Sequence, residues 1–174
     1  MKILAISGSL RAASINSTLL RVLAGVAPAG VEVRIYQELG ALPLFNPDIA
    51  PPPAVVARLE QALTEADAVV IASPEYAHGV TGALKNGLDW MVGNQSFVGK
   101  PVALFNAAPR AAHAHAALLE TVTVMSASVV EAACITLPLV GAGLGERQIA
   151  ADPAMVASLK TALAALRQHM ASGV

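Results

Sequence analysis

Short runs of β-branched and other apolar residues alternate with longer stretches of helical periodicity along this chain. Between and after the runs, leucine, valine and methionine recur at three- and four-residue spacing, which predicts an amphipathic helix after each strand. Alternation of this kind, with near-continuous apolar strands, is typical of a parallel sheet covered by helices on both faces. The predicted strands are Lys2–Ser7, Val31–Tyr36, Ala68–Ala72, Val102–Phe105 and Val129–Ile135.

Two segments interrupt the alternation. Residues 37–53 contain five prolines and are predicted to be a loop, and residues 136–153 a connection that bears glycine and proline. Five parallel strands favour the strand order 2-1-3-4-5, in a three-layer α/β/α sandwich, over the six-stranded dinucleotide-binding order. In that order the first and third strands are neighbours, and ligands bind in the crevice where the strand order reverses. We therefore expect residues 8–16 and 74–82 to form a site.

The composition limits the kind of protein that this chain can be. Of 174 residues, 55% are hydrophobic and 13% charged, which excludes a disordered chain and predicts one domain over residues 1–174. The net charge is −1, with no basic stripe, so neither nucleic acid nor a membrane surface is expected as a partner. No apolar run reaches the about 18 residues of a membrane span. Cys134 is the single cysteine, so no internal disulfide can form, which fits an expected cytoplasmic location.

The first of the two loops carries groups that suit a phosphate. Ser9, Arg11, Ser14 and Asn16 offer hydroxyls, a cation and an amide just before a predicted helix. Unpaired N–H groups and the helix dipole attract anions to such a position, and an arginine adds a charge-assisted pair. The alternative is that Ser14 or Asn16 simply caps the helix. The loop matches neither the GxxxxGK[ST] nor the GxGxxG pattern, which argues against nucleotide hydrolysis and a dinucleotide-binding fold.

The second loop begins with Pro74-Glu75-Tyr76, directly after the most strand-like run. An aromatic ring beside exposed backbone amides could hold a planar heterocycle and read its polar edge. The alternative is that Tyr76 packs locally and that Glu75 is a solvated turn residue. His78, in the same loop, could contact a substrate or supply protons, or be a turn residue near solvent.

Other chemistry has less support. A hydrolase that uses Ser7 or Ser9 with a distant histidine lacks a placed Ser–His–Asp set. His113 and His115 are two residues apart, so on one helix they point in different directions and cannot share a metal ion. We therefore expect no metal site. Cys134 is expected to be a small core residue.

Together, the two loops resemble the NADPH-dependent FMN reductases, a family that includes quinone, azo-dye and chromate reductases. The resemblance spans most of the chain in element order, and its specific motifs lie in residues 6–17 and 73–90. The matching residues are Gly8-Ser9-Leu10-Arg11-x-x-Ser14-x-Asn16, Ser73-Pro74-Glu75-Tyr76 and Leu84-Lys85-Asn86-x-x-Asp89-Trp90.

The resemblance implies a flavodoxin-like fold and a cofactor site. The FMN phosphate would be held by Ser9, Arg11, Ser14, Asn16 and Ser17. The isoalloxazine would be lined, largely through backbone groups, by Pro74, Glu75 and Tyr76 with the turn Ala77, His78 and Gly79. A helix and a subunit contact would be shaped by Lys85, Asn86, Asp89 and Trp90. The family usually forms dimers or tetramers, so a homodimer or homotetramer is expected.

The resemblance also implies an activity. NADPH, or NADH, would deliver a hydride to the flavin, which would pass electrons to a quinone, free flavin or another small acceptor. The flavin carries the chemistry, so no catalytic acid or base is nominated. The alternative is a flavodoxin-type electron carrier or a non-enzymatic flavin-binding protein. Such carriers are typically acidic and aromatic-rich, whereas this chain is nearly neutral and only 3% aromatic, which favours an enzyme.

Two positions depart from the family pattern. Many members have asparagine after Pro-Glu-Tyr, where this chain has Ala77. The loop after the fourth strand is often glycine-rich and flanks the flavin, but here it reads Asn106-Ala107-Ala108-Pro109-Arg110. The first departure removes one expected contact with the flavin. Together, the two departures predict that acceptor access and flavin affinity differ from those in the family.

Overall fold

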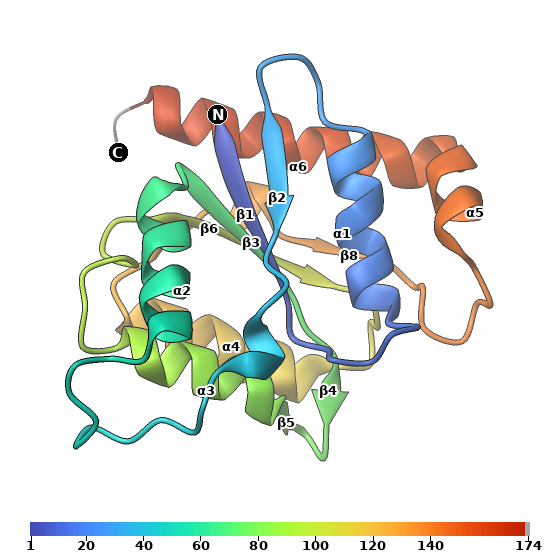
Figure 1. Ribbon diagram of the computed structural model, residues 1–174. Helices are drawn as coiled ribbons and strands as arrows, with labels where there is room; N and C mark the ends of the chain where they lie inside the picture. Colours follow the sequence, from blue (N-terminus) through green and yellow to red (C-terminus); the bar gives the residue numbers. More distant parts are fainter. Residues whose placement is uncertain (173–174) are drawn as a thin grey trace.

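The computed structural model describes residues 1–172. Its central sheet is parallel and runs in the order β2–β1–β3–β6 (Figure 1). Two short strands, β7 and β8, both pair with β6. The strands are β1 Lys2–Ser7, β2 Glu32–Ile35, β3 Ala68–Ala72, β6 Pro101–Asn106, β7 Ser128–Val129 and β8 Ile135–Thr136. The helices are α1 Ile15–Gly25, α2 Ala54–Glu65, α3 Gly82–Met91, α4 Ala112–Val124, α5 Glu146–Ala151 and α6 Pro153–Ala171. Single 3₁₀ turns lie at Leu39–Ala41 and Glu131–Ala133.

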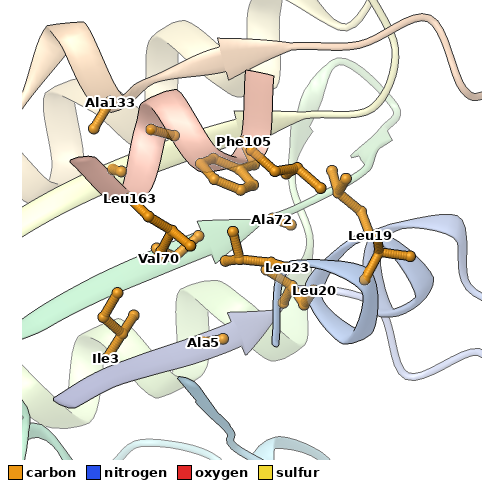
Figure 2. Packing of buried hydrophobic residues seen from close by; sticks show 14 of the residues in the cluster. Ile3, Ala5, Leu19, Leu20, Leu23, Val70, Ala72, Phe105, Ala133 and Leu163 are labelled. Carbon is orange, nitrogen blue, oxygen red and sulfur yellow. The ribbon is translucent and has the colours of Figure 1, made fainter. Parts of the chain in front are cut away.

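The sheet is buried on both faces because its strands are apolar at consecutive positions. Successive side chains of a strand point to opposite faces, so Ile3 and Ala5 join the core beneath α1 and α6, which Figure 2 shows. Leu4 and Ile6 join the core beneath α2 and α3. All five residues of β3 are buried. The three-layer sandwich and the strand order 2-1-3-4-5 are thus confirmed, with the fifth position divided between β7 and β8.

The prediction of one continuous strand over Val129–Ile135 is wrong. β7 pairs Val129 with Val102, and β8 pairs Ile135 with Phe105. The path from Val129 to Ile135 has three more residues than the matching path on β6, and these three cannot stay in the ladder. They leave it as the 3₁₀ turn Glu131–Ala133, which buries Ala133.

Other elements also differ from the prediction. The spacing of Leu19, Leu20, Leu23 and Val26 predicts a first helix over Ser17–Ala27. The helix instead begins at Ile15, because the Ser14 hydroxyl accepts a hydrogen bond from the backbone N–H of Ser17 and caps the helix there. A two-strand hairpin, β4 Glu75–Tyr76 and β5 Gly79–Val80, occupies the second loop. The short helix α5 lies within the predicted 136–153 connection. No helix within residues 1–172 is long and apolar enough to cross a membrane.

Candidate functional site

A pocket of about 680 Å³ opens at the carboxyl ends of β1, β3 and β6. It lies at the predicted switch point, and its volume is in the usual range for small-molecule sites. Both predicted loops contribute to it, through Ser9, Arg11, Ala13, Ser14, Ile15, Asn16, Ser73, Pro74, Glu75 and Tyr76. The other lining residues are Thr18, Asn106, Ala107, Ala108, Arg110, Ala111, Leu139, Val140, Gly141, Gly143, Leu144 and Gly145.

The first loop brings its polar groups to the start of α1. Ser14 caps the helix, as its alternative interpretation predicted, and it also lines the pocket. Asn16 is 3% exposed, and its buried Oδ1 has no hydrogen-bond partner within residues 1–172. A buried polar atom without a partner is costly, so this amide is poised to bind a ligand group. No acidic residue occupies the first turn of α1, which leaves its dipole free for an anion.

Arg11 and Ser17, both predicted to hold a phosphate, lie differently: Arg11 lines the pocket and Ser17 does not. Arg11 is exposed, and within the described chain no carboxylate pairs with its guanidinium. Ser17 does not line the pocket; its hydroxyl donates a 2.8 Å hydrogen bond to the hydroxyl of Ser7, at the end of β1. Ser17 therefore supports the loop from behind.

The second loop places Pro74, Glu75 and Tyr76 against the pocket but not the turn that follows. Ala77 and His78 form the tip of the β4–β5 hairpin, with φ of 49° and 60°, and Gly79 pairs with Tyr76. The side chain of Tyr76 is not packed away, since the residue is 57% exposed. Tyr76 is therefore available to a planar ligand.

The side chain of Glu75 is not solvated, so that alternative is wrong. It is 15% exposed, and its Oε2 accepts a 2.9 Å hydrogen bond from the backbone N–H of Ala114 in α4. Its Oε1 lies 3.3 Å from Nδ1 of His78. The His78 side chain is 76% exposed, and its ring meets that of His113 edge to face at 4.5 Å.

A third wall of the pocket combines the loop after β6, residues 106–111, with residues 139–145. The sequence did not predict that these two segments lie together. Asn106, at the end of β6, accepts a hydrogen bond from the N–H of Ala108 and donates a 3.4 Å one to the carbonyl of Ala111. The carbonyl of Ala107 accepts hydrogen bonds from the N–H groups of Leu139 and Val140, which brings residues 139–145 to the pocket. The sequence signal for this segment was the glycine and proline content of residues 136–153. In the structure, Gly141 and Gly143 adopt positive φ.

The residues of the third motif lie in α3, outside the pocket lining. Asn86 accepts a 2.8 Å hydrogen bond from the N–H of Phe45 and donates one to the carbonyl of Pro43. Trp90 donates to the same carbonyl through Nε1, and its ring lies edge-on to that of Phe45. Lys85 and Asp89 form an ion pair along the helix. This motif therefore holds the proline-rich loop against α3.

The charges around the pocket suit an anionic ligand. Two cations line it, Arg11 after β1 and Arg110 after β6, against the single carboxylate of Glu75. Glu75 is already bonded to the N–H of Ala114. An anionic group at the start of α1, joined to a planar ring beside Tyr76, fits these residues.

This fold defines a flavodoxin-like α/β protein, with its pocket at the carboxyl edge of the sheet. A flavodoxin from Pseudomonas aeruginosa has the same fold, with a TM-score of 0.60 at 14% identity over 92% of this chain and 99% of that one. The sequence profile of the family described as NADPH-dependent FMN reductase matches residues 1–143. The chain belongs to this family, which confirms the resemblance drawn from its motifs.

Individual relatives agree with the family match. A NAD(P)H-dependent FMN reductase from Pseudomonas aeruginosa is 39% identical over 112 residues, which is 62% of this chain and 60% of that protein. A quinone reductase from Escherichia coli is 37% identical over 107 residues, 59% of this chain and 57% of that protein. The matches thus span less than two thirds of these curated relatives. The flavoenzyme NAD(P)H:(acceptor) oxidoreductase FerB from Paracoccus denitrificans has a TM-score of 0.80 at 26% identity, over 97% of this chain and 98% of that one.

Proposed function

We propose that the chain is an FMN-dependent NAD(P)H oxidoreductase that transfers electrons to a small acceptor, such as a quinone or free flavin. The observation that carries this proposal is the pocket itself, which joins an anion-suited helix start to an exposed aromatic side chain at the switch point of the sheet. Membership of the NADPH-dependent FMN reductase family and the names of the relatives support it.

The residues present fit FMN. Its phosphate would be held by Ser9, Arg11, Ser14 and Asn16, with the buried Oδ1 of Asn16 accepting from a ribityl hydroxyl. Ser17 would act indirectly, through Ser7. The isoalloxazine would lie against Pro74, Glu75 and Tyr76 on one side of the pocket and Ala107 and Ala108 on the other. Ala77, His78 and Gly79 would shape the hairpin that presents Tyr76.

Bound FMN supplies hydride acceptance and electron transfer, and the protein supplies position and electrostatics. The guanidinium of Arg11 would orient the phosphate. The apolar residues Val140 and Leu144, which line the pocket, would restrict water there. No side chain in the pocket needs to move a proton for the hydride step.

An enzyme is distinguished from an electron carrier by turnover. With FMN and a benzoquinone present, the purified chain should oxidise NADPH continuously without another protein. An electron carrier needs a partner reductase, so NADPH consumption that appears only after a reductase is added contradicts the proposal. The rate with NADH in place of NADPH then identifies the preferred donor.

We also infer that the chain works as a homodimer or homotetramer in the cytoplasm. Leu44 is 83% exposed and Phe45 42% exposed, although hydrogen bonds to the backbone on either side of Leu44 fix this segment on α3. Rigidly held apolar side chains at the surface favour a protein interface. Light scattering after size exclusion tests this inference, and a monomer at micromolar concentration contradicts it.

A further inference from the structure

Two walls of the pocket come from segments that are distant in the sequence. One is the β4–β5 hairpin with Pro74, and the other is the loop from Asn106 to the start of α4. The hairpin follows β3, whereas the loop follows β6, the next strand in the sheet. The width of the pocket between these walls therefore depends on side-chain contacts across them.

The start of α4 lacks a side-chain cap of its own. Its N-cap residue is Ala111, and its first turn contains no acidic residue. The first N–H groups of a helix have no acceptor within the helix. The N–H of Ala114 finds one in Oε2 of Glu75, 39 residues away in sequence and 2.9 Å away in space. A charged acceptor at this position also interacts favourably with the helix dipole.

The same carboxylate contacts the tip of the hairpin. Oε1 of Glu75 lies 3.3 Å from Nδ1 of His78. Ala77 and His78 both adopt left-handed backbone conformations, which are unfavourable for residues other than glycine. The ring of His78 then packs edge to face on His113 of α4. Two contacts thus join the hairpin to the first turn of α4: Glu75 with the N–H of Ala114, and His78 with His113. Glu75 makes the first contact itself and supports the second through its contact with His78.

The geometry points to Glu75 as a positioning residue whose carboxylate fixes the β4–β5 hairpin to the start of α4 and so sets the width of the cofactor pocket. Both of its oxygens are engaged with the protein, and its side chain is 15% exposed. Glu75 lines the pocket, but its carboxylate acts on the flavin ring through the two walls rather than as an acid, a base or a direct ligand. This inference rests on the proposed function for its ligand, but the contact itself belongs to the free protein.

The test compares Glu75→Ala with Glu75→Gln, and with Glu120→Gln as a control that removes one negative charge from an exposed position of α4. In the free protein, Glu75→Ala should speed hydrogen exchange at the Ala114 amide at least tenfold. It should also raise the Kd for FMN about tenfold and change the visible circular dichroism of bound FMN. Glu75→Gln keeps an oxygen acceptor and should lose clearly less on each measure. Glu120→Gln should change none of them.

The outcomes separate this inference from the proposed function. If the unaltered protein fails to bind FMN, the proposed function fails, while exchange at Ala114 still tests the contact. If FMN binds to Glu75→Ala as tightly and with the same dichroism as to the unaltered protein, the positioning role is wrong. Equal losses in Glu75→Gln and Glu75→Ala would also overturn it, because the acceptor oxygen would then have no effect. Should Glu75→Ala not fold, Glu75→Gln against Glu120→Gln tests the loss of the charge alone: a smaller rise in the Kd for FMN is expected in Glu75→Gln only, and identical Kd values in the two variants would overturn the positioning role.

Discussion

The hydroxyl of Thr81 donates a 2.6 Å hydrogen bond to the carbonyl oxygen of Gly8, and so joins the start of α3 to the loop that follows β1. The same hydroxyl caps α3 by accepting from the N–H of Leu84 at 3.4 Å. Both Thr81 and Gly8 are buried. The two loops that carry the family motifs are therefore fixed to each other by one side chain outside the pocket lining.

Thr81→Val removes this hydrogen bond with little change in shape. It should lower the free energy of unfolding by about 1–3 kcal/mol, because the buried carbonyl of Gly8 loses its hydroxyl donor. Thr81→Ser keeps the hydroxyl and should cost clearly less. Chemical denaturation of the three proteins measures the difference, and equal stability of Thr81→Val and the unaltered chain would contradict this assignment.

Position 8 requires glycine because the structure leaves no room there for a side chain. A Cβ at this position would overlap Oγ of Ser73 and lie 2.8 Å from its Cβ, so one of the two loops would have to shift. Gly8→Ala should therefore cost about 1–3 kcal/mol of stability, as overpacking does. Adding Ser73→Gly should recover part of this loss, which a double-mutant cycle detects. Gly25→Ala is the control, because a Cβ there meets no atom within 4 Å; destabilisation by that change equal to Gly8→Ala would reject a steric cause.

Arg11→Ala tests the proposed phosphate site. Charge-assisted hydrogen bonds contribute about 1.5–3 kcal/mol, so the Kd for FMN should rise about tenfold to a hundredfold. Arg11→Lys keeps the charge but not the planar donor pair, so its Kd for FMN should lie between those of the unaltered protein and Arg11→Ala. Arg167→Ala, an exposed change on α6, controls for net charge. Fluorescence titration provides the constants, and unchanged affinity in Arg11→Ala would remove this residue from the site.

The pH dependence of stability should include a contribution from His115. Burial lowers the pKa of this histidine below its usual value, so the unfolded chain binds its proton more readily than the folded one. Stability is therefore greatest above the unfolded pKa, about 6.5, and falls as the pH drops through it. His115→Gln should reduce the loss of melting temperature between pH 7.5 and 5.5 relative to the unaltered protein. An unchanged pH profile in His115→Gln would contradict the prediction.

Much of the fold could be predicted because hydrophobic patterning reflects burial directly. β3 is apolar at every position and is buried at every position. The division of the fifth strand could not be predicted, since Val129–Ile135 is apolar at every position except Glu131, and one charged residue does not by itself end a strand. Only pairing with β6 shows that three residues must leave the ladder.

The site was predictable where it is local in sequence. Ser14 and Asn16 stand beside the helix that they begin, so their place in the pocket follows from the motif. The role of Glu75 depends on Ala114, 39 residues later, and no local pattern reveals that contact. Residues 139–145 reach the pocket only because Leu139 and Val140 bond to the carbonyl of Ala107.

The flavin site is tested most directly by binding of FMN to the purified chain. Titration of FMN with the protein should quench flavin fluorescence saturably, with one FMN per chain. Ala108→Trp, which would fill part of the pocket, should weaken this binding strongly without unfolding the protein. NADPH should then bleach the absorption of the bound flavin. No saturable change in fluorescence, or binding unaffected by Ala108→Trp, would contradict a flavin site in this pocket.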